Sequence, residues 1–463
     1  MKKYRALLKD VFLFAASTFV PKAISFFLVP LYTSCLTTAE YGTVDLLSTT
    51  VSLLIPILTF DICDGVMRFT IENKSDARPL VIAVSYVFRS AFAVIVVLGL
   101  NFIFDFFTID YYLTFFFILN YISVAFYGVL IAYIRAIEKV TLLAIISVTT
   151  SAVTIISNII LLLIFRIGIL GYLISGVIGY VVVDIIMFVK IKGYRLLQNE
   201  KKLDRQLQCE MLNYSIPLVV ANISWWINSS SDRYIVTALC GVKENGVYSI
   251  AYKIPTILQM LQSVFSQAWL LSVFREYKQE NGAQYVSEVY EMYYSSMSIA
   301  CACLILMDVP MARFLYAYDF FEAWRYVPFL LISVVFMSCG GFYESLLTLH
   351  KKSKLVAITT AFGALCNITL NILLIKTVGV MGAAIATVCG YLVTWITRIG
   401  PTMKEYPFKV KWAKQILLCA LLIIQAATLV IYQNYYVCVS IVALIILMNG
   451  RILIRIVNTL KNK

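Results

Sequence analysis

The chain has 463 residues, of which 61% are hydrophobic and only 14% are charged, and its mean hydropathy is +0.87. These values lie outside the range of soluble globular proteins, so the composition excludes an ordinary soluble fold and predicts a membrane protein. The formal net charge of +13 would suggest nucleic-acid binding in a soluble protein. Here the cations lie between apolar segments, which favours roles in topology and in contact with anionic lipid rather than nucleic acid.

Fourteen long apolar segments follow one another through the chain. A hydrocarbon core roughly 30 Å thick needs about 20 apolar residues of helix, so these segments have the length that spans a bilayer. They lack the polar alternation of barrel strands, and the predicted fold class is therefore an all-α polytopic membrane protein. In chain order, the expected spans are Val11–Leu36, Val44–Asp64, Pro79–Phe104, Tyr111–Ile134, Val140–Phe165, Ile167–Val189, Leu212–Cys240, Val247–Val273, Tyr293–Val309, Trp324–Leu349, Leu355–Ile375, Val378–Ile399, Trp412–Tyr432 and Tyr435–Ile456.

The Lys and Arg residues gather in every second gap between these segments. Of the 38 cations, 29 are counted at the amino terminus and in the even-numbered gaps, including those from Arg398 to Lys414, and five in the odd-numbered gaps. Cytoplasmic loops are enriched in Lys and Arg, so both termini and the linker Lys190–Glu210 are expected in the cytoplasm. The first apolar run is too long for a cleaved signal peptide and is expected to remain as the first helix.

A pattern of glycines indicates an internal repeat. Gly168, Gly171 and Gly179 recur 211 residues later at Gly379, Gly382 and Gly390, and Glu40-Tyr41-Gly42 recurs 204 residues later as Glu244-Asn245-Gly246. We expect two parallel six-helix repeats, residues 1–200 and 201–405, followed by two additional helices in residues 406–463. The alternative is a chance recurrence, because small residues are common where membrane helices touch.

Motifs for catalysis and cofactor binding are missing from the sequence. There is no GxxxxGK[ST] phosphate loop and no HExxH motif, and His350 is the only histidine. The sequence therefore predicts no enzyme, no cofactor and no metal site. The eleven Cys residues form no CxxC pair and are expected to serve as small packing residues.

Four cations lie inside the expected spans: Lys22, Arg89, Arg233 and Lys253. Each costs at least about 2.5 kcal/mol at the centre of a membrane helix unless it is paired or hydrated. We therefore expect them to line a hydrated cavity and to bind the anionic headgroup of a substrate. Arg suits bidentate contact with phosphate, and Lys supplies a compact charge.

Acidic residues leave a second interpretation open. Asp61, Asp232 and Glu344 lie in or near the spans, where they either bind a coupling ion or balance the cations in structural pairs. Adjacent helical residues point about 100° apart, so Asp232 and Arg233 are poor partners for each other.

Two pairs of motifs carry a family resemblance. Pro30-Leu31-Tyr32 is followed by Glu40-Tyr41-Gly42, and Ser231-Asp232-Arg233-Tyr234 is followed by the run from Gly246 to Lys253, GVYSIAYK. In these motifs, and in its length and number of spans, the chain resembles the polysaccharide-synthesis transporters. These are the Wzx-type flippases of O-antigen and capsule repeat units in the multidrug/oligosaccharidyl-lipid/polysaccharide (MOP) exporter superfamily.

The resemblance implies a fold and a function. The fold would be a V of two six-helix bundles, like that of a MATE transporter, around a cationic lumen. The function would be to move undecaprenyl-diphosphate-linked oligosaccharide repeat units across the bacterial inner membrane, from the cytoplasmic to the periplasmic leaflet. Coupling to a proton or sodium gradient, contact with membrane lipid, and association with a polysaccharide polymerase and other assembly proteins would accompany it.

Three alternatives remain at this point. A cation-coupled multidrug exporter of the same superfamily would favour an acidic cavity. A peptidoglycan-precursor flippase would handle a similar headgroup. A non-transporting scaffold for polysaccharide assembly would have no need of charges inside the membrane.

Overall fold

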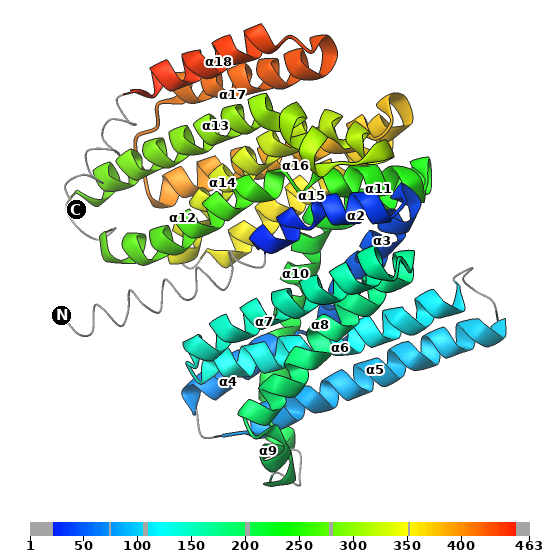
Figure 1. The fold of residues 1–463 in the computed structure, drawn as a ribbon. Coiled ribbons are helices and arrows are strands. Elements are labelled where there is room, and N and C mark those ends of the chain that lie inside the picture. The colour runs from blue at the N-terminus through cyan, green and yellow to red at the C-terminus, as the bar shows by residue number, and fades with distance from the viewer. Residues whose placement is uncertain are drawn as a thin grey trace. The chain divides into compact units, whose positions relative to one another are not determined.

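A computed structural model describes residues 22–73, 76–104, 110–199, 204–276, 281–350 and 352–450. The start of the expected first helix and the first four cations lie outside the described residues. Within the described residues all regular secondary structure is helical, as Figure 1 shows, and the predicted all-α class is confirmed. The chain forms two compact units, Met1–Trp226 and Ile227–Lys463.

The first unit contains eight helices and the first part of α10 in its described residues. A helical stretch begins at Lys22 and leads into α2. The elements are α2 (Val29–Cys35), α3 (Thr38–Leu58), α4 (Ile62–Glu72), α5 (Arg78–Phe104), α6 (Tyr111–Ala136), α7 (Val140–Asn158) with its π-helical extension η1 (Ile159–Ile164), α8 (Gly168–Lys190), α9 (Gly193–Asn199) and α10 (Arg205–Cys240).

The second unit takes the rest of α10 and the helices that follow. These are α11 (Val242–Ala251), α12 (Pro255–Glu276), α13 (Gly282–Leu315), the 3-10 helix η2 (Tyr318–Arg325), α14 (Val327–Leu349), α15 (Ser353–Val378), α16 (Met381–Glu405), α17 (Trp412–Ala427) with the π-helical turn η3 (Thr428–Tyr432), and α18 (Tyr435–Met448). The two carboxy-terminal helices pack against α13 within this unit (Figure 1).

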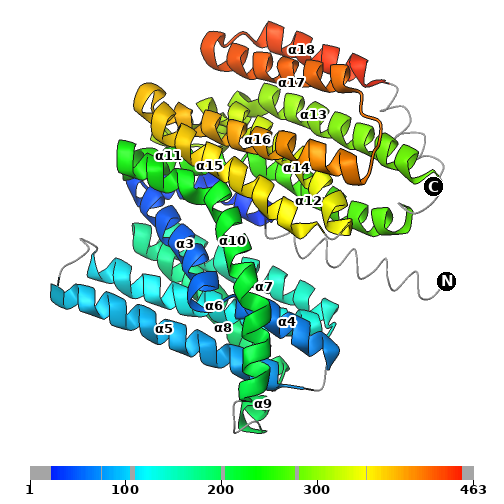
Figure 2. The same ribbon diagram turned by 180° about the vertical axis from the view of Figure 1, so that it is seen from behind.

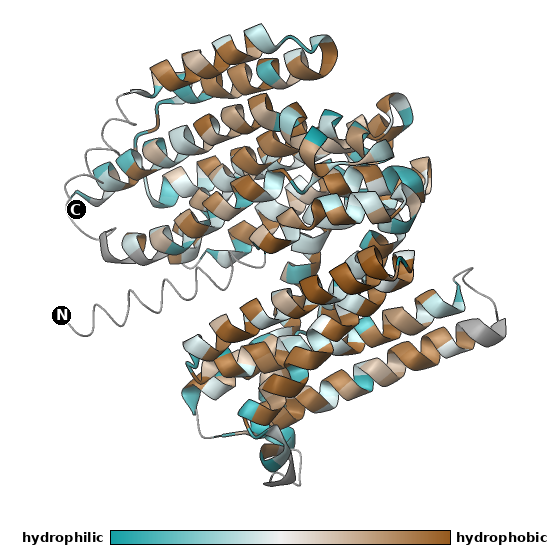
Figure 3. Cartoon of the chain, in the orientation of Figure 1, coloured by the Kyte–Doolittle hydropathy of each residue, from teal (hydrophilic) through white to brown (hydrophobic). Residues whose placement is uncertain are grey.

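The expected spans fall on helices throughout the described residues. Ten helices there are long and apolar enough to cross a membrane, and Lys22–Cys35 and Tyr435–Met448 are shorter apolar helices. The other two expected spans fall on α10 and on α11 with α12, whose polar residues lower their mean hydropathy. Large apolar side chains such as Phe88, Phe92 and Ile185 are exposed. In Figure 3, brown marks hydrophobic residues and occurs along most of the helices. In a multi-pass membrane protein such surfaces face lipid.

Two expected spans are interrupted. In Val247–Val273, α11 ends at Ala251 and α12 begins at Pro255. The segment Val44–Asp64 was expected as one helix, but α3 ends at Leu58 and α4 begins at Ile62. Between them Phe60 and Asp61 both adopt positive φ, 53° and 52°, which is uncommon for residues other than glycine. The expectation of one continuous helix is therefore wrong here, because apolar composition does not register a local break in the backbone.

The glycines of the predicted repeat occupy equivalent places in the two units. Gly168, the first residue of α8, and Gly379, between α15 and α16, both adopt positive φ, 56° and 63°, where a side chain would be strained. A Cβ atom on Gly179 would collide with Thr154 of α7, and one on Gly390 would lie 2.8 Å from Cβ of Asn367 on α15. The pairs α7–α8 and α15–α16 therefore approach closely through matching glycines, and Figure 2 shows α15 beside α16.

Candidate functional site

The four predicted substrate-binding cations are divided between the two units. Lys22 is exposed at the start of the first described helix, and Arg89 is exposed on α5, with its guanidinium carbon 5.4 Å from the centre of the Tyr86 ring. Arg233 on α10 and Lys253, between α11 and α12, are both half-buried in the second unit. A cavity shared by all four therefore stays a prediction, while Arg233 and Lys253 belong to one unit and lie at the two ends of the second family motif.

A buried carboxylate organises that motif. Asp232 is 3% exposed, and its Oδ2 accepts hydrogen bonds from the hydroxyls of Tyr248 at 2.7 Å and Tyr252 at 2.6 Å, and from Thr387 of α16 at 3.4 Å. Tyr248 and Tyr252 lie four residues apart, so both point from the same side of the chain at the carboxylate. We call Asp232, Arg233, Tyr248, Tyr252 and Thr387 the Asp232 cluster.

Arg233 joins this cluster through an aromatic ring. Its guanidinium carbon lies 5.2 Å from the centre of the Tyr252 ring, and its backbone N–H donates to Oδ1 of Asp232 at 3.0 Å. Asp232 and Arg233 thus meet at one tyrosine, Asp232 at the hydroxyl and Arg233 at the ring face. A cation over an aromatic face gains about 0.5–2 kcal/mol, and this contact holds the guanidinium in a defined place.

A buried cation was missed by the sequence analysis. Arg398 was counted with the cytoplasmic gap, but it lies inside α16, is only 4% exposed and forms an ion pair of 2.8 Å with Glu344 of α14. Its guanidinium also donates to Thr359 at 3.2 Å, to Thr360 at 2.8 Å and to the carbonyl of Gly340 at 3.0 Å. Placing Arg398 in the gap is therefore wrong, because α16 continues to Glu405. Its position within an expected span was the signal that could have identified it.

The predicted acidic residues have different surroundings. Asp61 lies at the break between α3 and α4 and accepts a hydrogen bond of 2.8 Å from Asn222 of α10. Asp232 accepts from hydroxyl groups, and Glu344 pairs with Arg398 while its side chain stays 45% exposed. Whether any of them binds a coupling ion stays a prediction.

Asp308 is a further acidic residue that the sequence analysis did not select. It lies on α13 with no exposed surface, and within the described residues neither carboxyl oxygen has a hydrogen-bond partner. Its place in the otherwise apolar run from Ala302 to Val309 was the available signal. A group of three or more His, Cys, Asp or Glu residues that could hold a metal ion does not occur in the described ranges.

Comparison with known families decides the assignment. A family model described as polysaccharide biosynthesis protein matches residues 7–274, which is more than half of the chain. The chain belongs to this family. The family expected from the sequence motifs is confirmed, and the matched segment includes the Asp232–Tyr252 part of the cluster.

Solved structures share the fold at low sequence identity. A structure titled lipid II flippase MurJ, inward closed conformation, is 13% identical, with a TM-score of 0.69 over 96% of this chain and 99% of that one. An inward-facing multidrug resistance MATE family transporter of the MOP superfamily is 12% identical, with a TM-score of 0.68 over 84% of this chain and 97% of that one. A mutant MATE transporter of Vibrio cholerae is 13% identical, with a TM-score of 0.58 over 88% and 98% of the two chains.

One curated relative also matches. An uncharacterized membrane protein of Methanocaldococcus jannaschii is 23% identical over 187 residues, or 40% of this chain and 44% of that protein. The match thus spans less than half of the relative's length.

Proposed function

We propose that this protein is a flippase that moves an undecaprenyl-diphosphate-linked oligosaccharide from the cytoplasmic to the periplasmic leaflet of a bacterial inner membrane. Its family supports a role in polysaccharide biosynthesis, and the fold it shares with a lipid II flippase supports transport rather than catalysis. The observation that carries the proposal is the position of Arg233, a cation within an expected span whose guanidinium lies against the Tyr252 ring in the family motif.

The diphosphate is the part of this substrate that the cations would recognise. Arg233 offers a planar fork that matches two phosphate oxygens, while Lys253, Lys22 and Arg89 would add compact or bidentate charge along the path.

Coupling to an ion gradient is part of the proposal, and a proton is the ion that the chain favours. Asp308 has neither a cation nor a hydrogen-bond partner in the described residues, and an ionised carboxylate so placed would cost several kcal/mol. A sodium or other metal ion would need several oxygen ligands around it. We therefore propose that Asp308 carries a proton in this conformation, whereas Asp61, Asp232 and Glu344 mainly balance or orient other groups.

A cation-coupled multidrug exporter is the second candidate. The likeness to a MATE family transporter favours it, since the two folds are similar over most of both chains. Such an exporter would favour an acidic cavity that binds its coupling cation, and the cationic Arg233 beside the cluster argues for an anionic cargo instead.

Reconstituted vesicles test the proposal directly. The purified chain is placed in liposomes that contain a fluorescent undecaprenyl-diphosphate oligosaccharide, and a membrane-impermeant quencher reports how much label changes leaflet. We expect wild type to flip the lipid, Arg233→Ala to lose at least about tenfold in rate, and Arg233→Lys to keep part of it, because charge remains but the fork is lost. Arg325→Ala is the matched control, since Arg325 pairs with Glu322 at an exposed site.

Two outcomes would reject the proposal. One is a flipping rate of the wild type equal to that of empty vesicles, together with drug export by the same preparation. The other is full activity of Arg233→Ala at normal abundance. If Arg233→Ala is poorly folded, the double variant Asp232→Asn/Arg233→Ala removes both charges, and activity restored by it would contradict direct substrate binding.

A further inference from the structure

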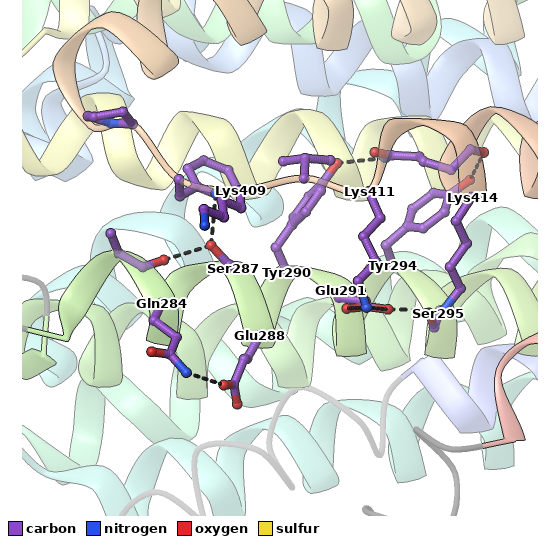
Figure 4. A pocket seen from close by; sticks show the side chains of 15 residues that line it. Gln284, Ser287, Glu288, Tyr290, Glu291, Tyr294, Ser295, Lys409, Lys411 and Lys414 are labelled. Atoms are coloured by element: carbon purple, nitrogen blue, oxygen red, sulfur yellow. Dashed lines mark hydrogen bonds and ion pairs between the residues drawn. The ribbon is translucent and has the colours of Figure 1, made fainter.

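A pocket in the second unit lies apart from the Asp232 cluster. It has a volume of about 650 Å³ and lies between the first turns of α13 and the segment 407–415 that leads into α17. Figure 4 shows side chains from both segments converging on it. The pocket is therefore built where the additional carboxy-terminal helices join the six-helix repeat.

Lysines supply one part of the pocket. Lys409, Lys411 and Lys414 line it, against the carboxylates of Glu288 and Glu291. Glu291 accepts from Lys411 at 2.8 Å and from Lys414 at 3.1 Å, and Figure 4 shows both lysines reaching it. The Lys411 side chain is 70% exposed, so its pair with Glu291 is weak and can be exchanged for a phosphate at little cost.

Buried polar atoms supply another part. Gln415 is 3% exposed and its amide donates 2.7 Å to the hydroxyl of Tyr290, but within the described residues its carbonyl Oε1 has no hydrogen-bond donor. Ser295 also lines the pocket, has no exposed surface, and its hydroxyl has no partner there. A buried acceptor without a donor is costly, about 1–3 kcal/mol, so a ligand that brings hydroxyl groups would be stabilised at this wall.

The position along the chain indicates the source of such a ligand. Segment 407–415 belongs to an even-numbered gap, so the expected topology puts it on the cytoplasmic side. The membrane part of α13 is expected to begin at Tyr293 and that of α17 at Trp412, so the pocket lies at the depth of lipid headgroups. Tyr, Trp and Lys are the residues that anchor helices at this interface.

We propose that this pocket binds the headgroup of an anionic phospholipid that carries free hydroxyls, as phosphatidylglycerol does. The phosphate would contact Lys411 and Lys414, and the glycerol hydroxyls would donate to Gln415 and Ser295 beside the ring of Tyr290. The bound lipid bridges α13 and α17 and so fastens the carboxy-terminal helix pair to the repeat. This inference needs only the membrane location and not the identity of the transported substrate.

Lipid retention measured by native mass spectrometry tests the proposal. The full chain is released from nanodiscs that contain phosphatidylcholine with phosphatidylglycerol, or with phosphatidic acid, which has phosphate but no headgroup hydroxyl. For wild type we expect phosphatidylglycerol to be retained about tenfold more than phosphatidylcholine, and more than phosphatidic acid.

Three variants separate the two parts of the pocket. Glu291→Gln/Lys411→Gln/Lys414→Gln removes the ion pairs together, leaves no unpaired carboxylate, and should lose the preference for both anionic lipids. Gln415→Leu should lose only the preference for phosphatidylglycerol over phosphatidic acid. The control Lys354→Gln/Lys404→Gln replaces two exposed lysines outside the pocket and should behave as wild type.

Several results would overturn the proposal. Equal retention by the triple variant and the control means that the lysines do not bind lipid. An unchanged preference in Gln415→Leu means that the hydroxyls are not recognised. A third result is displacement of the lipid by millimolar glycerol phosphate, together with an increase in thermal midpoint equal to the increase that phosphatidylglycerol gives. It would mean that the pocket accepts a soluble phosphate ester instead of a lipid.

Discussion

The guanidinium of Arg398 lies 2.8 Å from the carboxylate of Glu344, and the two partners differ sharply in exposure. The Arg398 side chain is 5% exposed and that of Glu344 is 45% exposed. Water can therefore stabilise the carboxylate by itself, whereas the guanidinium depends on its protein contacts.

This asymmetry predicts an order of stability. Glu344→Gln leaves a buried cation unneutralised and should cost about 2–4 kcal/mol, whereas Arg398→Met should cost less. Thr359 and Thr360 keep hydrogen bonds to helix carbonyls when the guanidinium is removed. The thermal midpoint of the protein in nanodiscs measures both effects, and Arg325→Met is the exposed control. If the double variant Glu344→Gln/Arg398→Met were less stable than Glu344→Gln alone, the destabilisation could not come from an unneutralised Arg398.

The Asp232 cluster predicts a graded series of variants. Asp232→Ala removes the acceptor that two buried tyrosine hydroxyls share, so it should destabilise more than Asp232→Asn, which keeps one oxygen. Tyr248→Phe and Tyr252→Phe should each cost about 1.5–3 kcal/mol, the range for hydrogen bonds to a charged group.

Thermal midpoints of the single and double tyrosine variants measure this series. The double variant should differ from the sum of the singles, because the groups share one carboxylate. Asp319→Asn is the matched control, since Asp319 pairs with Lys243 at the surface. Equal midpoints for Asp232→Ala and Asp319→Asn would show that the cluster contributes nothing.

Replacing Asp308 should not destabilise the protein, unlike replacing Asp232 or Glu344, because Asp308 has no hydrogen-bond partner to lose among the described residues. Asp308→Asn should keep a thermal midpoint at pH 8 equal to or above that of wild type, while Glu344→Gln lowers it. If Asp308 carries the coupling proton, the same variant should lose the acceleration of flipping by an imposed pH gradient but keep the rate without one. A gradient response equal to that of wild type would remove Asp308 from the coupling step.

A charge network outside the spans predicts a pH dependence. Arg78 pairs with Asp76 at 2.8 Å and with Asp204 at 2.9 Å, and its hydrogen bond holds the pKa of the Asp76 carboxyl below its usual value. A lowered folded-state pKa adds stability that is present above the unfolded-state pKa of about 3.9 and is lost as the pH falls through the folded-state pKa.

Arg78→Gln should therefore lower the thermal midpoint at pH 7, by the equivalent of at most about 1 kcal/mol because Arg78 is partly exposed. The difference from wild type should shrink as the pH falls below about 4. A difference that is constant from pH 7 to pH 3 would show that Arg78 acts by packing alone.

The sequence by itself determined the class of protein, the family and the places of the spans. Burial of apolar residues in a bilayer depends on composition over about 20 residues, so segments such as Tyr111–Ile134 can be recognised without any knowledge of their neighbours. The repeat of Gly168 at Gly379 could also be recognised from the sequence, because a backbone with positive φ favours glycine at the equivalent position of each unit.

Only the tertiary structure decided which polar groups meet. Thr387 reaches Asp232 across 155 residues, and Arg398 finds Glu344 on another helix, because of how each helix is rotated about its axis. One residue of offset turns a side chain by about 100°, which hydropathy does not record. The break at Asp61 and the isolation of Asp308 were equally hidden, since both depend on what surrounds the residue and not on the residue itself.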